Sequence, residues 1–479
     1  MLSLASQCGN TLLKIVSGQN PREIAVQILQ RRQGGEFVEN LLDAALERAR
    51  LAPADRGLCQ ELVYGIARWQ ATLDWLISRK ARNSAPKPLL QDLLRLGLYQ
   101  IFWLDRIPNH AAVNETVELA KRNRLSAQAG FVNAVLRGYL REFDATKQLL
   151  ADLKTNQPQL GYSHPEWLVE RWQKRWGGEQ IFRLLEWNNF PPKTFARVNT
   201  LKADPGKLLA QWRDENVEYD FVRYDWLEEN LVFELKSHPP LARLPSFQQG
   251  LFYVQDPSTL LAVKALDPNL GETILDLCAA PGGKLTYIAQ LMNNEGRLVA
   301  HDLSPERLKL VEENCARLGL TCVQTSSDLR GAVGRPSRAG HSRPTSQGLV
   351  GRGVPTAPGL VSGHLPLTPL PSHFDKVLLD APCSNTGVMR RRVDLRWRIT
   401  PEEISRLRSL QLELLNQGAS LLKPGGTLVY STCSLEPEEN QQLIHEFLSA
   451  HPNLKLDVER ELLPFAEGVD GAYVARLRG

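Results

Sequence analysis

Residues 274–289 read ILDLCAAPGGKLTYIA, the pattern of a buried strand, a glycine turn and a helix. Gly282 and Gly283 let the backbone approach a ligand closely, and they begin a helix whose N-terminus favours a carboxylate or phosphate. The stretch lacks the GxGxxG pattern, and Lys284-Leu285-Thr286 lacks the long spacing of a Walker A motif. It therefore predicts a ligand-binding turn, but one that suits neither a nicotinamide dinucleotide nor a nucleoside triphosphate.

The same alternation of strand and helix continues from residue 251 to residue 479. Its segments are TILDLCAA, GKLTYIAQLM, RLVAHDLS, ERLKLVEENCARLG, CVQTSSD, FDKVLLDAP, ISRLRSLQLELLNQGASLL and GTLVYSTC. This succession predicts a doubly wound, mostly parallel, Rossmann-like sheet, with ligands at the carboxyl ends of the strands. Residues 331–372 interrupt it, because they are rich in Gly, Pro and Ser and contain no acid. We expect this segment to be a disordered insertion.

Three regions precede this domain. Residues 1–19 lack the features of a signal peptide and are expected to be a loose extension. Residues 20–142 place apolar side chains at three- and four-residue spacing, as in PLLQDLLRLGLYQIFWL, which predicts an all-α bundle. Residues 143–250 combine a helical stretch, HPEWLVERWQKRWG, with strand-like FARVNTL, VEYDFV and NLVFEL, which predicts a small α+β module.

Basic side chains are frequent on the polar faces of the predicted bundle. They are Arg22, Arg31, Arg32, Arg68, Lys80, Arg82, Lys121, Arg122, Arg124 and Arg137. Such runs are usually solvated helix surface, and RNA contact is the alternative. Trp167, Trp172 and Trp176 of the middle module are expected to fill core and interface positions and not to stack on bases.

The composition sets wider limits. A chain of 479 residues with 43% hydrophobic and 23% charged residues predicts several globular domains, and no apolar run is long enough to span a bilayer. The formal charge of +4 permits a nucleic-acid partner without requiring one. The seven cysteines form no CxxC and no zinc spacing with histidine, so we expect a reducing cytoplasm and no structural metal.

Acids at successive strand ends indicate the cofactor. Asp302 ends the second strand, where an acid can bind both ribose hydroxyls, and Asp328 ends the third, where it can accept a hydrogen bond from an adenine amino group. Helix capping or turn formation would explain any one acid, but not the ordered set. With no phosphate-binding pattern beside them, these acids favour a nucleoside such as S-adenosylmethionine.

Two cysteines end two other strands of the same sheet: Cys383 in LLDAPCSNTGV and Cys433 in YSTCSLEPEEN. A single buried cysteine is usually inert. Two of them beside Asp380 and a methyl donor predict thiol chemistry on a carbon that does not react unaided, such as cytosine C5. A thiolate that adds to C6 makes C5 nucleophilic, and a carboxylic acid near N3 assists the addition.

The motifs DLCAAPGGK, DAPCSNTGV and YSTCSLEPEEN, together with the helical N-terminal region, resemble the RsmB/Sun/Fmu family of bacterial small-subunit (16S) ribosomal RNA cytosine-5 methyltransferases. RVNTLK and QDPS match the family's middle region and the start of its catalytic domain. The resemblance covers about residues 20–479 apart from the insertion. It implies a NusB-like RNA-binding domain, the small middle module and a Rossmann-like methyltransferase of the NOL1/NOP2/Sun type.

The resemblance also implies roles for individual residues. Asp302 would bind the ribose, Asp328 the adenine, and Asp380 would face both methyl donor and cytosine. Cys433 would be the nucleophile, and Cys383 would assist release of the product, whereas DNA cytosine-5 methyltransferases use the cysteine of Pro-Cys. The loop around the methionine end of S-adenosylmethionine would be Cys278, Ala279, Ala280, Pro281, Gly282, Gly283 and Lys284. Leu285 departs from the threonine that is common in the family.

Partners and alternatives follow from these assignments. We expect a monomer that binds single-stranded or loop ribosomal RNA, free or partly assembled, without a metal or a membrane. The arginines of GVMRRRVDLRWR (387–398) are expected to contact phosphates and not to form a solvated loop. A transfer RNA cytosine-5 methyltransferase would share the catalytic residues, and only the NusB-like region disfavours it. The intact catalytic residues argue against a non-catalytic RNA-binding or antitermination factor. An amino-group methyltransferase typically carries Asn/Asp-Pro-Pro-Tyr/Phe at the corresponding strand end, whereas this sequence has Asp-Ala-Pro-Cys there.

Overall fold

The computed structural model describes residues 20–32, 34–81, 86–329 and 370–479. The expectations for residues 1–19 and for nearly all of 331–372 therefore lie outside the described residues. The chain divides into two units: residues through Asn189 with Arg392–Trp397, and Phe190–Arg391 with Arg398–Gly479. Among the described helices, none has the length and apolar character needed to cross a membrane.

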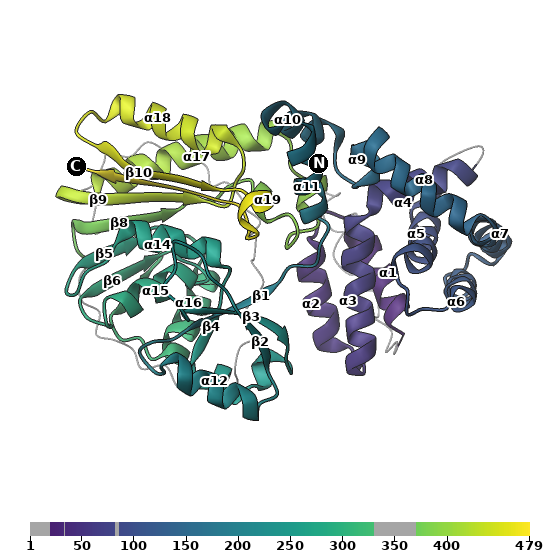
Figure 1. Ribbon diagram of the computed structural model, residues 1–479, viewed down its shortest axis with the longest axis horizontal. Helices are drawn as coiled ribbons and strands as arrows, with labels where there is room; N and C mark the ends of the chain where they lie inside the picture. The colour runs from purple at the N-terminus through teal and green to yellow at the C-terminus, as the bar shows by residue number, and fades with distance from the viewer. Residues whose placement is uncertain (1–19, 33, 82–85, 330–369) are drawn as a thin grey trace, which may run out of the picture. The chain divides into compact units, whose positions relative to one another are not determined.

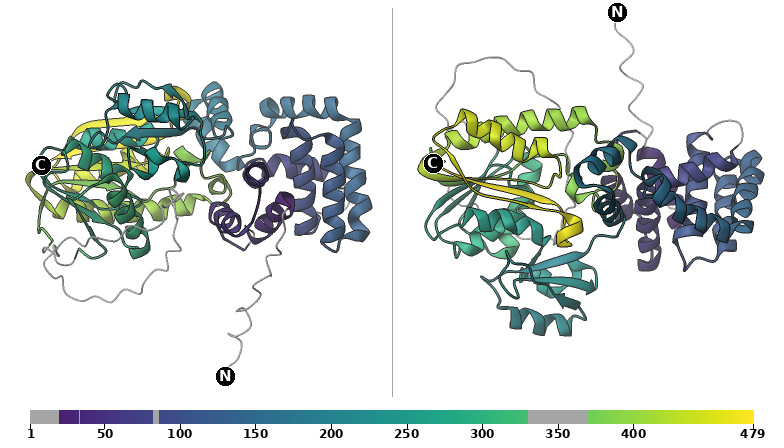
Figure 2. Two further views of the ribbon diagram at one scale, coloured as in Figure 1. Left: turned by 90° about the horizontal axis from the view of Figure 1, so that it is seen from below. Right: turned by 45° about the horizontal axis from the view of Figure 1, so that its top comes forward.

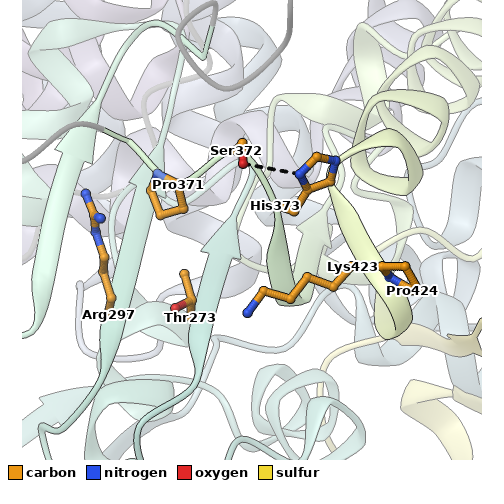
Figure 3. Close-up of a pocket in the computed structure, with 7 residues that line it drawn as sticks. All are labelled: Thr273, Arg297, Pro371, Ser372, His373, Lys423 and Pro424. Carbon is orange, nitrogen blue, oxygen red and sulfur yellow. Dashed lines mark hydrogen bonds between the residues drawn. The ribbon is translucent and has the colours of Figure 1, made fainter.

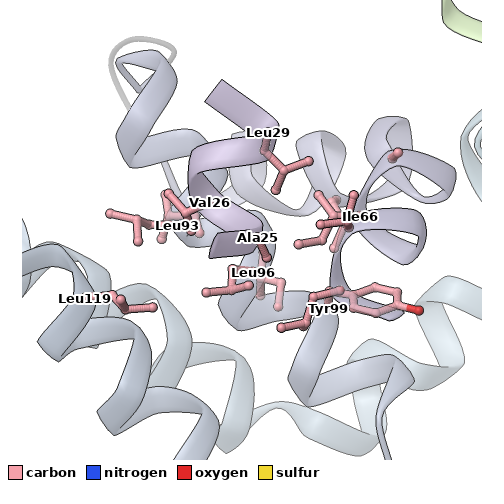
Figure 4. Close-up of a cluster of buried hydrophobic side chains, with 14 of the residues drawn as sticks. Ala25, Val26, Leu29, Ile66, Leu93, Leu96, Tyr99 and Leu119 are labelled. Carbon is pink, nitrogen blue, oxygen red and sulfur yellow. The ribbon is translucent and has the colours of Figure 1, made fainter. Parts of the chain in front are cut away.

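Among its described residues the first unit contains helices and no strand, which confirms the predicted bundle. Its helices are α1 (Pro21–Arg32), α2 (Val38–Arg48), α3 (Pro53–Arg68), α4 (Gln70–Lys80), α5 (Pro88–Trp103), α6 (Asn109–Arg122), η1 (Ser126–Gln128), α7 (Ala129–Arg141), α8 (Phe143–Asn156), α9 (Pro158–Gly161), α10 (Glu166–Trp176), α11 (Gly178–Trp187) and η5 (Leu395–Trp397). Helix α5 is buried along most of its length and contacts α1, α3, α4, α6 and α7. Figure 4 shows Leu93 and Leu96 of α5 in a cluster with Ala25, Val26 and Ile66. The helical spacing of apolar residues thus produces a shared core of helices α1 to α7.

Residues 392–397 complete this helical unit, although they are distant in sequence. Val393 is 1% exposed and belongs to the same hydrophobic cluster as Val26 and Leu93. The Asp394 carboxylate accepts a 2.8 Å hydrogen bond from the backbone N–H of Val38 and pairs with Arg32. Residues that follow a strand of the second unit are therefore part of the core of the first.

The side chain of Arg396 is fully buried here. Its guanidinium donates hydrogen bonds to the carbonyl oxygens of Ser163 (3.1 Å) and Asn188 (2.8 Å) and to Oδ1 of Asn189 (2.8 Å). The prediction of a phosphate contact is wrong for this arginine. The sequence shows the run of positive charge, but only the fold shows that carbonyl groups surround it.

Helices α8 to α11 also belong to the first unit, whereas the sequence suggested that a separate module starts at residue 143. The reason is that strands begin only at Thr194, and the helices before them pack with other helices. Trp172 is 1% exposed, as expected for a core residue, and Trp167 and Trp176 are half-buried.

The second unit begins with a small antiparallel sheet in the order β2-β3-β1-β4. Its strands are β1 (Thr194–Val198), β2 (Glu218–Phe221), β3 (Val232–Ser237) and β4 (Phe252–Val254), with α12 (Pro205–Asp214), η2 (Leu241–Arg243) and α13 (Pro245–Gln248) between them. Trp212 of α12 is fully buried against Phe233 and Phe252. The expected α+β character of this region is confirmed.

A seven-stranded sheet follows, in the order β10-β11-β9-β8-β5-β6-β7. Its strands are β5 (Thr273–Asp276), β6 (Arg297–His301), β7 (Val323–Ser326), β8 (Phe374–Asp380), β9 (Leu422–Thr432), β10 (Lys455–Leu462) and β11 (Ala472–Arg478). The pairs among β5 to β9 are parallel, and β11 runs antiparallel to both of its neighbours. The predicted doubly wound, mostly parallel sheet is confirmed.

Helices cover both faces of this sheet (Figures 1 and 2). Ile274 packs in a cluster with residues of α14, α15 and α16, whereas the next residue, Leu275, packs in a cluster with residues of α17 and α18. This alternation is that of a strand buried on both faces. The bounds are η3 (Pro257–Thr259), α14 (Leu260–Leu266), α15 (Gly283–Leu291), α16 (Pro305–Leu318), η4 (Thr386–Val388), α17 (Pro401–Ser420), η6 (Pro437–Glu439), α18 (Gln441–Ala450) and α19 (Pro464–Glu467).

The order of the strands also locates the ligand crevice. From β5 the chain proceeds outward to β6 and β7, and it then returns to β8 on the other side of β5. In an open α/β sheet a ligand binds outside the carboxyl ends of the strands at such a reversal. The carboxyl ends of β5 and β8 are therefore the place where a ligand site is expected.

Candidate active site

Polar and thiol groups gather where four parallel strands of the sheet end. We call this place, at the carboxyl ends of the strands, the carboxyl edge. Asp276 is the last residue of β5 and Asp380 the last of β8, while Asp302 and Cys433 directly follow β6 and β9. The register pairs Asp380 with Ser431 of β9. Parallel strands share one direction, so all these side chains lie at the same edge.

Asp328 is placed differently. It follows β7 at the end of the sheet order, it is exposed, and its backbone oxygen accepts a 2.7 Å hydrogen bond from Ser326 Oγ. It lies next to the part of the chain outside the described residues. Of the predicted site residues it is the one at the margin of the site.

The glycine turn joins β5 to α15. Gly282 has φ +102°, a left-handed conformation that other residues rarely adopt, and the helix begins at Gly283. A Cβ atom at Gly283 would approach Gln255 Nε2 to 3.1 Å. The Ala279 N–H donates a 2.8 Å hydrogen bond to the His301 carbonyl, which ties the turn to β6. Leu285, the departure from the family pattern, is fully buried in the core.

Arg197, on β1 of the small antiparallel sheet, supports this turn. Its guanidinium donates 2.9 Å hydrogen bonds to the carbonyl of Gly283 and to Thr286 Oγ1, and it is 1% exposed. The rings of Tyr253 and Tyr287 lie within 5.4 Å and 4.9 Å of it. Burial lowers its pKa to about 10, so it remains a cation at neutral pH. It fixes the first turn of α15.

Asp276 is a buried acid with unused hydrogen-bonding capacity. It is 1% exposed, and no donor among the described residues reaches its Oδ1. Burial raises its pKa to about 8; the charge of Asp380 adds to the rise, and Lys284 opposes it. An unpaired buried carboxylate oxygen at the glycine turn fits a cationic ligand group such as an ammonium.

Asp302 is held in a defined orientation. It is 5% exposed, it accepts a 3.0 Å hydrogen bond from the N–H of Ser304, and it pairs with Arg307 at 3.1 Å. Arg307 also donates to the carbonyl of Ala280 at 2.8 Å. The acid that ends β6 is thereby connected to the glycine turn.

Lys284 and Asp380 form an ion pair at the centre of the edge. Lys284 Nζ lies 2.6 Å from Asp380 Oδ2, and Ser431 Oγ donates a 2.8 Å hydrogen bond to Oδ1. Burial tends to lower the pKa of Lys284, but the negative charges of Asp380 and other groups that include Cys433 outweigh it and raise that pKa. The site therefore holds a lysine cation beside a carboxylate and a sulfur.

The two cysteines meet here. The sulfur atoms of Cys383 and Cys433 are 3.4 Å apart, and the Cys433 thiol donates a 3.1 Å hydrogen bond to Asn385 Oδ1. Cys383 is 4% exposed, whereas Cys433 is half-buried. The hydrogen bond with Cys433, burial and the charge of Glu439 raise the pKa of Cys383 well above the ordinary value. The more accessible sulfur is thus that of Cys433, directly after β9.

Two of the arginines that follow Cys383 pair with carboxylates. Arg390 is 2% exposed and pairs with Asp470 at 2.6 Å, and Arg391 pairs with Asp256 at 2.8 Å. The predicted phosphate contact is wrong for Arg390, as it is for Arg396, because both side chains are buried. Arg391 is 26% exposed, and its phosphate contact stays a prediction, as do those of Arg392 and Arg398. The carboxylate partners of Arg390 and Arg391 lie in QDPS and near the C-terminus, and this distance in sequence concealed them. These two arginines anchor the loop that carries Cys383.

A pocket lies at the amino ends of the parallel strands, opposite the ends that carry the cysteines (Figure 3). Thr273 and Arg297 begin β5 and β6, and His373 and Lys423 lie at the starts of β8 and β9. The pocket is therefore separate from the cysteines. Among the described residues, no group of three or more His, Cys, Asp or Glu side chains could hold a metal ion.

Three site residues were not identified from the sequence. Asp276 ends a strand just as Asp302 does, so the same rule could have found it. Asn385 stands within the DAPCSNTGV motif, but spacing alone does not show that it reaches Cys433. Arg197 belongs to RVNTLK, where nothing marks it as a support of the glycine turn.

Together, the sheet with its single reversed strand, the glycine turn and the acids at strand ends define the class: a Rossmann-like S-adenosylmethionine-dependent methyltransferase. Comparison with known families agrees. Residues 19–141 match the NusB family, and residues 164–234 match the RsmF/B-like methyltransferase ferredoxin-like domain. Residues 263–337 and 360–478 match 16S rRNA methyltransferase RsmB/F. The chain belongs to the RsmB/F family of 16S rRNA methyltransferases.

Individual relatives extend this comparison over nearly the whole chain. The probable ribosomal RNA small subunit methyltransferase B of Bacillus subtilis is 36% identical over 95% of this chain and 98% of its own. Ribosomal RNA small subunit methyltransferase B of Klebsiella pneumoniae is 35% identical over 96% and 98%. The crystal structure of a methyltransferase homolog from Pyrococcus horikoshii is 29% identical over 67% of this chain and 97% of its own, with a TM-score of 0.52.

Proposed function

We propose that this protein transfers a methyl group from S-adenosylmethionine to C5 of a cytosine in small-subunit ribosomal RNA, through a covalent adduct at Cys433. The observation that carries the proposal is the pair of sulfur atoms 3.4 Å apart, beside the Lys284–Asp380 ion pair. One sulfur can attack while the other remains a thiol. Methylation of an exocyclic amino group needs no such pair.

The cofactor fits the residues at the carboxyl edge. We assign its methionine end to the loop from Cys278 to Lys284 and to the unpaired oxygen of Asp276, and its ribose to Asp302. When bound, it supplies an electrophilic methyl group on a sulfonium. Asp328 is assigned to the adenine, as the most exposed of these contacts.

Cys433 begins the reaction that we propose. Its sulfur, as the thiolate, forms a bond to C6 of the cytosine, and the ring becomes an enamine whose C5 is nucleophilic. Lys284 places positive charge close to this sulfur, which is the kind of neighbour that favours a thiolate. Asn385 orients the sulfur through its hydrogen bond.

In this proposal Asp380 interacts with the polar edge of the cytosine ring. Lys284 and Ser431 each donate a hydrogen bond to one of its oxygens, which fixes the carboxylate plane. We assign to Asp380 the contact with N3 of the cytosine while the thiolate adds to C6. Lys284, which is hydrogen-bonded to Asp380, is the source of the proton that N3 takes up.

Cys383 completes the cycle. After C5 has gained the methyl group, its proton must leave before the C6–sulfur bond can break. We assign this elimination to Cys383, because it lies next to the attacking sulfur and is buried away from water. Its raised pKa keeps it a thiol at first. In this proposal Cys383 gives that proton to the Lys284 amine, which is neutral after it has protonated N3, and the resulting Cys383 thiolate takes the C5 proton.

The substrate is proposed to be single-stranded or loop RNA bound by a monomer. A base within a stacked helix cannot bring C6 to a half-buried sulfur, so the cytosine must leave its stack. The match of residues 19–141 to the NusB family supports an RNA-binding role for the helical unit.

The test uses labelled methyl donor with under-methylated small-subunit RNA, and transfer RNA as the competing substrate. We expect methylation of one cytosine by the wild-type protein and none by Cys433→Ala. Cys383→Ala should accumulate a protein–RNA adduct that survives denaturation, because the elimination is blocked.

Cys322→Ser is the matched control, since this cysteine directly precedes the amino end of β7, at the other end of the strands from Cys383 and Cys433, and should leave the rate unchanged. Full activity in Cys433→Ala, or label on adenine, would contradict the mechanism. Label on transfer RNA alone would show that the substrate is transfer RNA and not small-subunit ribosomal RNA.

A further inference from the structure

Glu439 has a position that the reaction described above does not use. It ends η6 (Pro437–Glu439), and its side chain is fully buried between the loops that carry the two cysteines. Its Oε1 accepts 2.9 Å hydrogen bonds from the Ser384 N–H and from Gln411 Nε2. Its Oε2 accepts hydrogen bonds from Ser434 Oγ, at 2.5 Å, and from Ser384 Oγ. One carboxylate is therefore bonded to the neighbour of each cysteine.

We propose that Glu439 is a positioning residue that sets the separation of the Cys383 and Cys433 sulfurs by holding Ser384 and Ser434 together. The proposal rests on the two-cysteine mechanism, because only that mechanism requires a fixed distance between the sulfurs. Glu439 acts through the serines and not on the substrate.

Other contacts join the same two loops and show that they form one connected unit. The Gly387 N–H donates to the Cys433 carbonyl at 2.9 Å, and the Leu435 N–H donates to Thr386 Oγ1 at 2.8 Å. Gln411 also donates to the Pro382 carbonyl at 2.9 Å, so helix α17 takes part. Glu439 is the charged member of this network and receives four of its hydrogen bonds.

A buried carboxylate is a costly way to join two loops. Burial raises the pKa of Glu439, and the donors from Ser384, Ser434 and Gln411 offset only part of that rise. Buried ionic groups are weak contributors to stability, and their best-attested role is to specify one arrangement among several. The specified arrangement here is the contact between the two sulfurs.

The chemistry of the donors provides a matched pair of variants. The two donors to Oε1 are N–H groups, which cannot become acceptors. The two donors to Oε2 are hydroxyls, which can rotate and accept. Glu439→Gln can therefore keep all four hydrogen bonds, with its NH2 group facing Ser384 Oγ and Ser434 Oγ. Glu439→Ala leaves all four donors without their acceptor.

The sulfur separation is measured without catalysis, by a dithiol probe. Phenylarsine oxide takes two thiols, forms two arsenic–sulfur bonds and releases water, so its affinity reports whether the sulfurs can meet. We expect the wild type and Glu439→Gln to bind one equivalent, and Cys383→Ser to give the single-thiol baseline. Glu439→Ala should bind about tenfold more weakly, consistent with lost hydrogen bonds to a charged group.

Kinetics on RNA separate positioning from general damage. Glu439→Ala should lower kcat by at least about tenfold with KM for RNA little changed, whereas Glu439→Gln should stay within about threefold of wild type. Ser434→Ala, which removes one of the four hydrogen bonds, should lie between them in both assays. It also keeps the test valid if Glu439→Ala fails to fold.

The outcomes distinguish this proposal from the mechanism. Wild-type arsenical affinity in both Glu439→Ala and Ser434→Ala would overturn the positioning role, and so would equal loss in Glu439→Gln and Glu439→Ala. If the arsenical affinities follow the expected order but Cys383→Ala never accumulates an RNA adduct, the positioning role stands and the covalent mechanism fails.

Discussion

At the scale of single residues, the site depends on charges that burial makes unusual. Asp276 lies at the end of β5 with a pKa near 8, and Lys284 remains a cation because Asp380 lies 2.6 Å away. A carboxyl group that is partly neutral at pH 7 can respond to a ligand, because a cation placed against it favours the ionised form. We therefore propose that the unpaired Oδ1 of Asp276 takes part in binding the cofactor.

Asp276 also predicts how stability changes with pH. Its pKa is raised in the folded protein from an ordinary value of 3.8. The stabilisation from its bound proton is therefore complete below pH 4 and is lost as the pH rises through about 8. We expect Asp276→Asn to be more stable than the wild type at pH 9, by at least about 1 kcal/mol, the equivalent of one pKa unit.

The comparison at pH 6 is the internal control, because there the wild-type carboxyl is still protonated and the difference in free energy of unfolding should shrink. Urea unfolding of both proteins without cofactor measures it. A difference that is the same at both pH values would show that Asp276 is not the titrating group.

At the scale of elements, the basic helices of the first unit divide into two groups. Arg32 is paired with Asp394, Arg68 is 5% exposed, and Lys80 is paired with Glu142. In contrast, four cations near the end of α6 and on α7 are exposed: Lys121, Arg122, Arg124 and Arg137. The first group is tied into the fold, whereas the second group is exposed near the end of α6 and on α7, where RNA could reach it.

This division predicts which charges bind RNA. We expect Arg122→Glu/Arg124→Glu to lower the affinity for small-subunit RNA by about tenfold or more and to reduce the salt dependence by about two counterions. Fluorescence anisotropy between 50 and about 200 mM salt measures both quantities.

Arg48→Glu/Arg50→Glu is the matched control, because it makes the same change in net charge at exposed positions around the end of α2. An equal loss of affinity in both double variants would mean that the protein binds RNA through its overall charge and not through α6 and α7.

At the scale of the whole molecule, the chain does not divide into domains in the order of its sequence. It leaves the second unit after Arg391, contributes Val393, Asp394 and Arg396 to the first, and returns at Arg398. The loop that carries Cys383 is therefore continuous with a segment of the helical core. A division drawn from sequence alone would place that segment entirely in the catalytic domain.

Replacement of residues 392–397 by six Gly and Ser residues tests this organisation. The helical unit would lose a buried apolar side chain and the hydrogen bonds of Asp394 and Arg396, so its calorimetric transition should fall by several degrees. The affinity for S-adenosylmethionine should remain near wild type, because the cofactor residues belong to the second unit.

Glu403→Ala/Arg406→Ala serves as the control, since this pair is exposed on α17 and such pairs contribute little to stability. A transition unchanged by the replacement, or a parallel loss of cofactor affinity, would contradict the assignment of residues 392–397 to the helical unit.

The sequence by itself determined the elements and the class of chemistry. The helical spacing of apolar residues, the alternation from residue 251 and the glycine turn are local patterns, and local patterns indicate secondary structure and the class of fold. They also placed Asp302, Asp380, Cys383 and Cys433 at strand ends, because parallel strands share one direction.

The tertiary structure alone decided which charges are free and which groups meet. Arg390, Arg391 and Arg396 are one run in the sequence, yet each finds its partners in other segments of the chain. Glu439 is one of three acids in LEPEEN, and only folding shows that it joins the two cysteine loops. Such contacts depend on distance in space, which spacing along a chain does not specify.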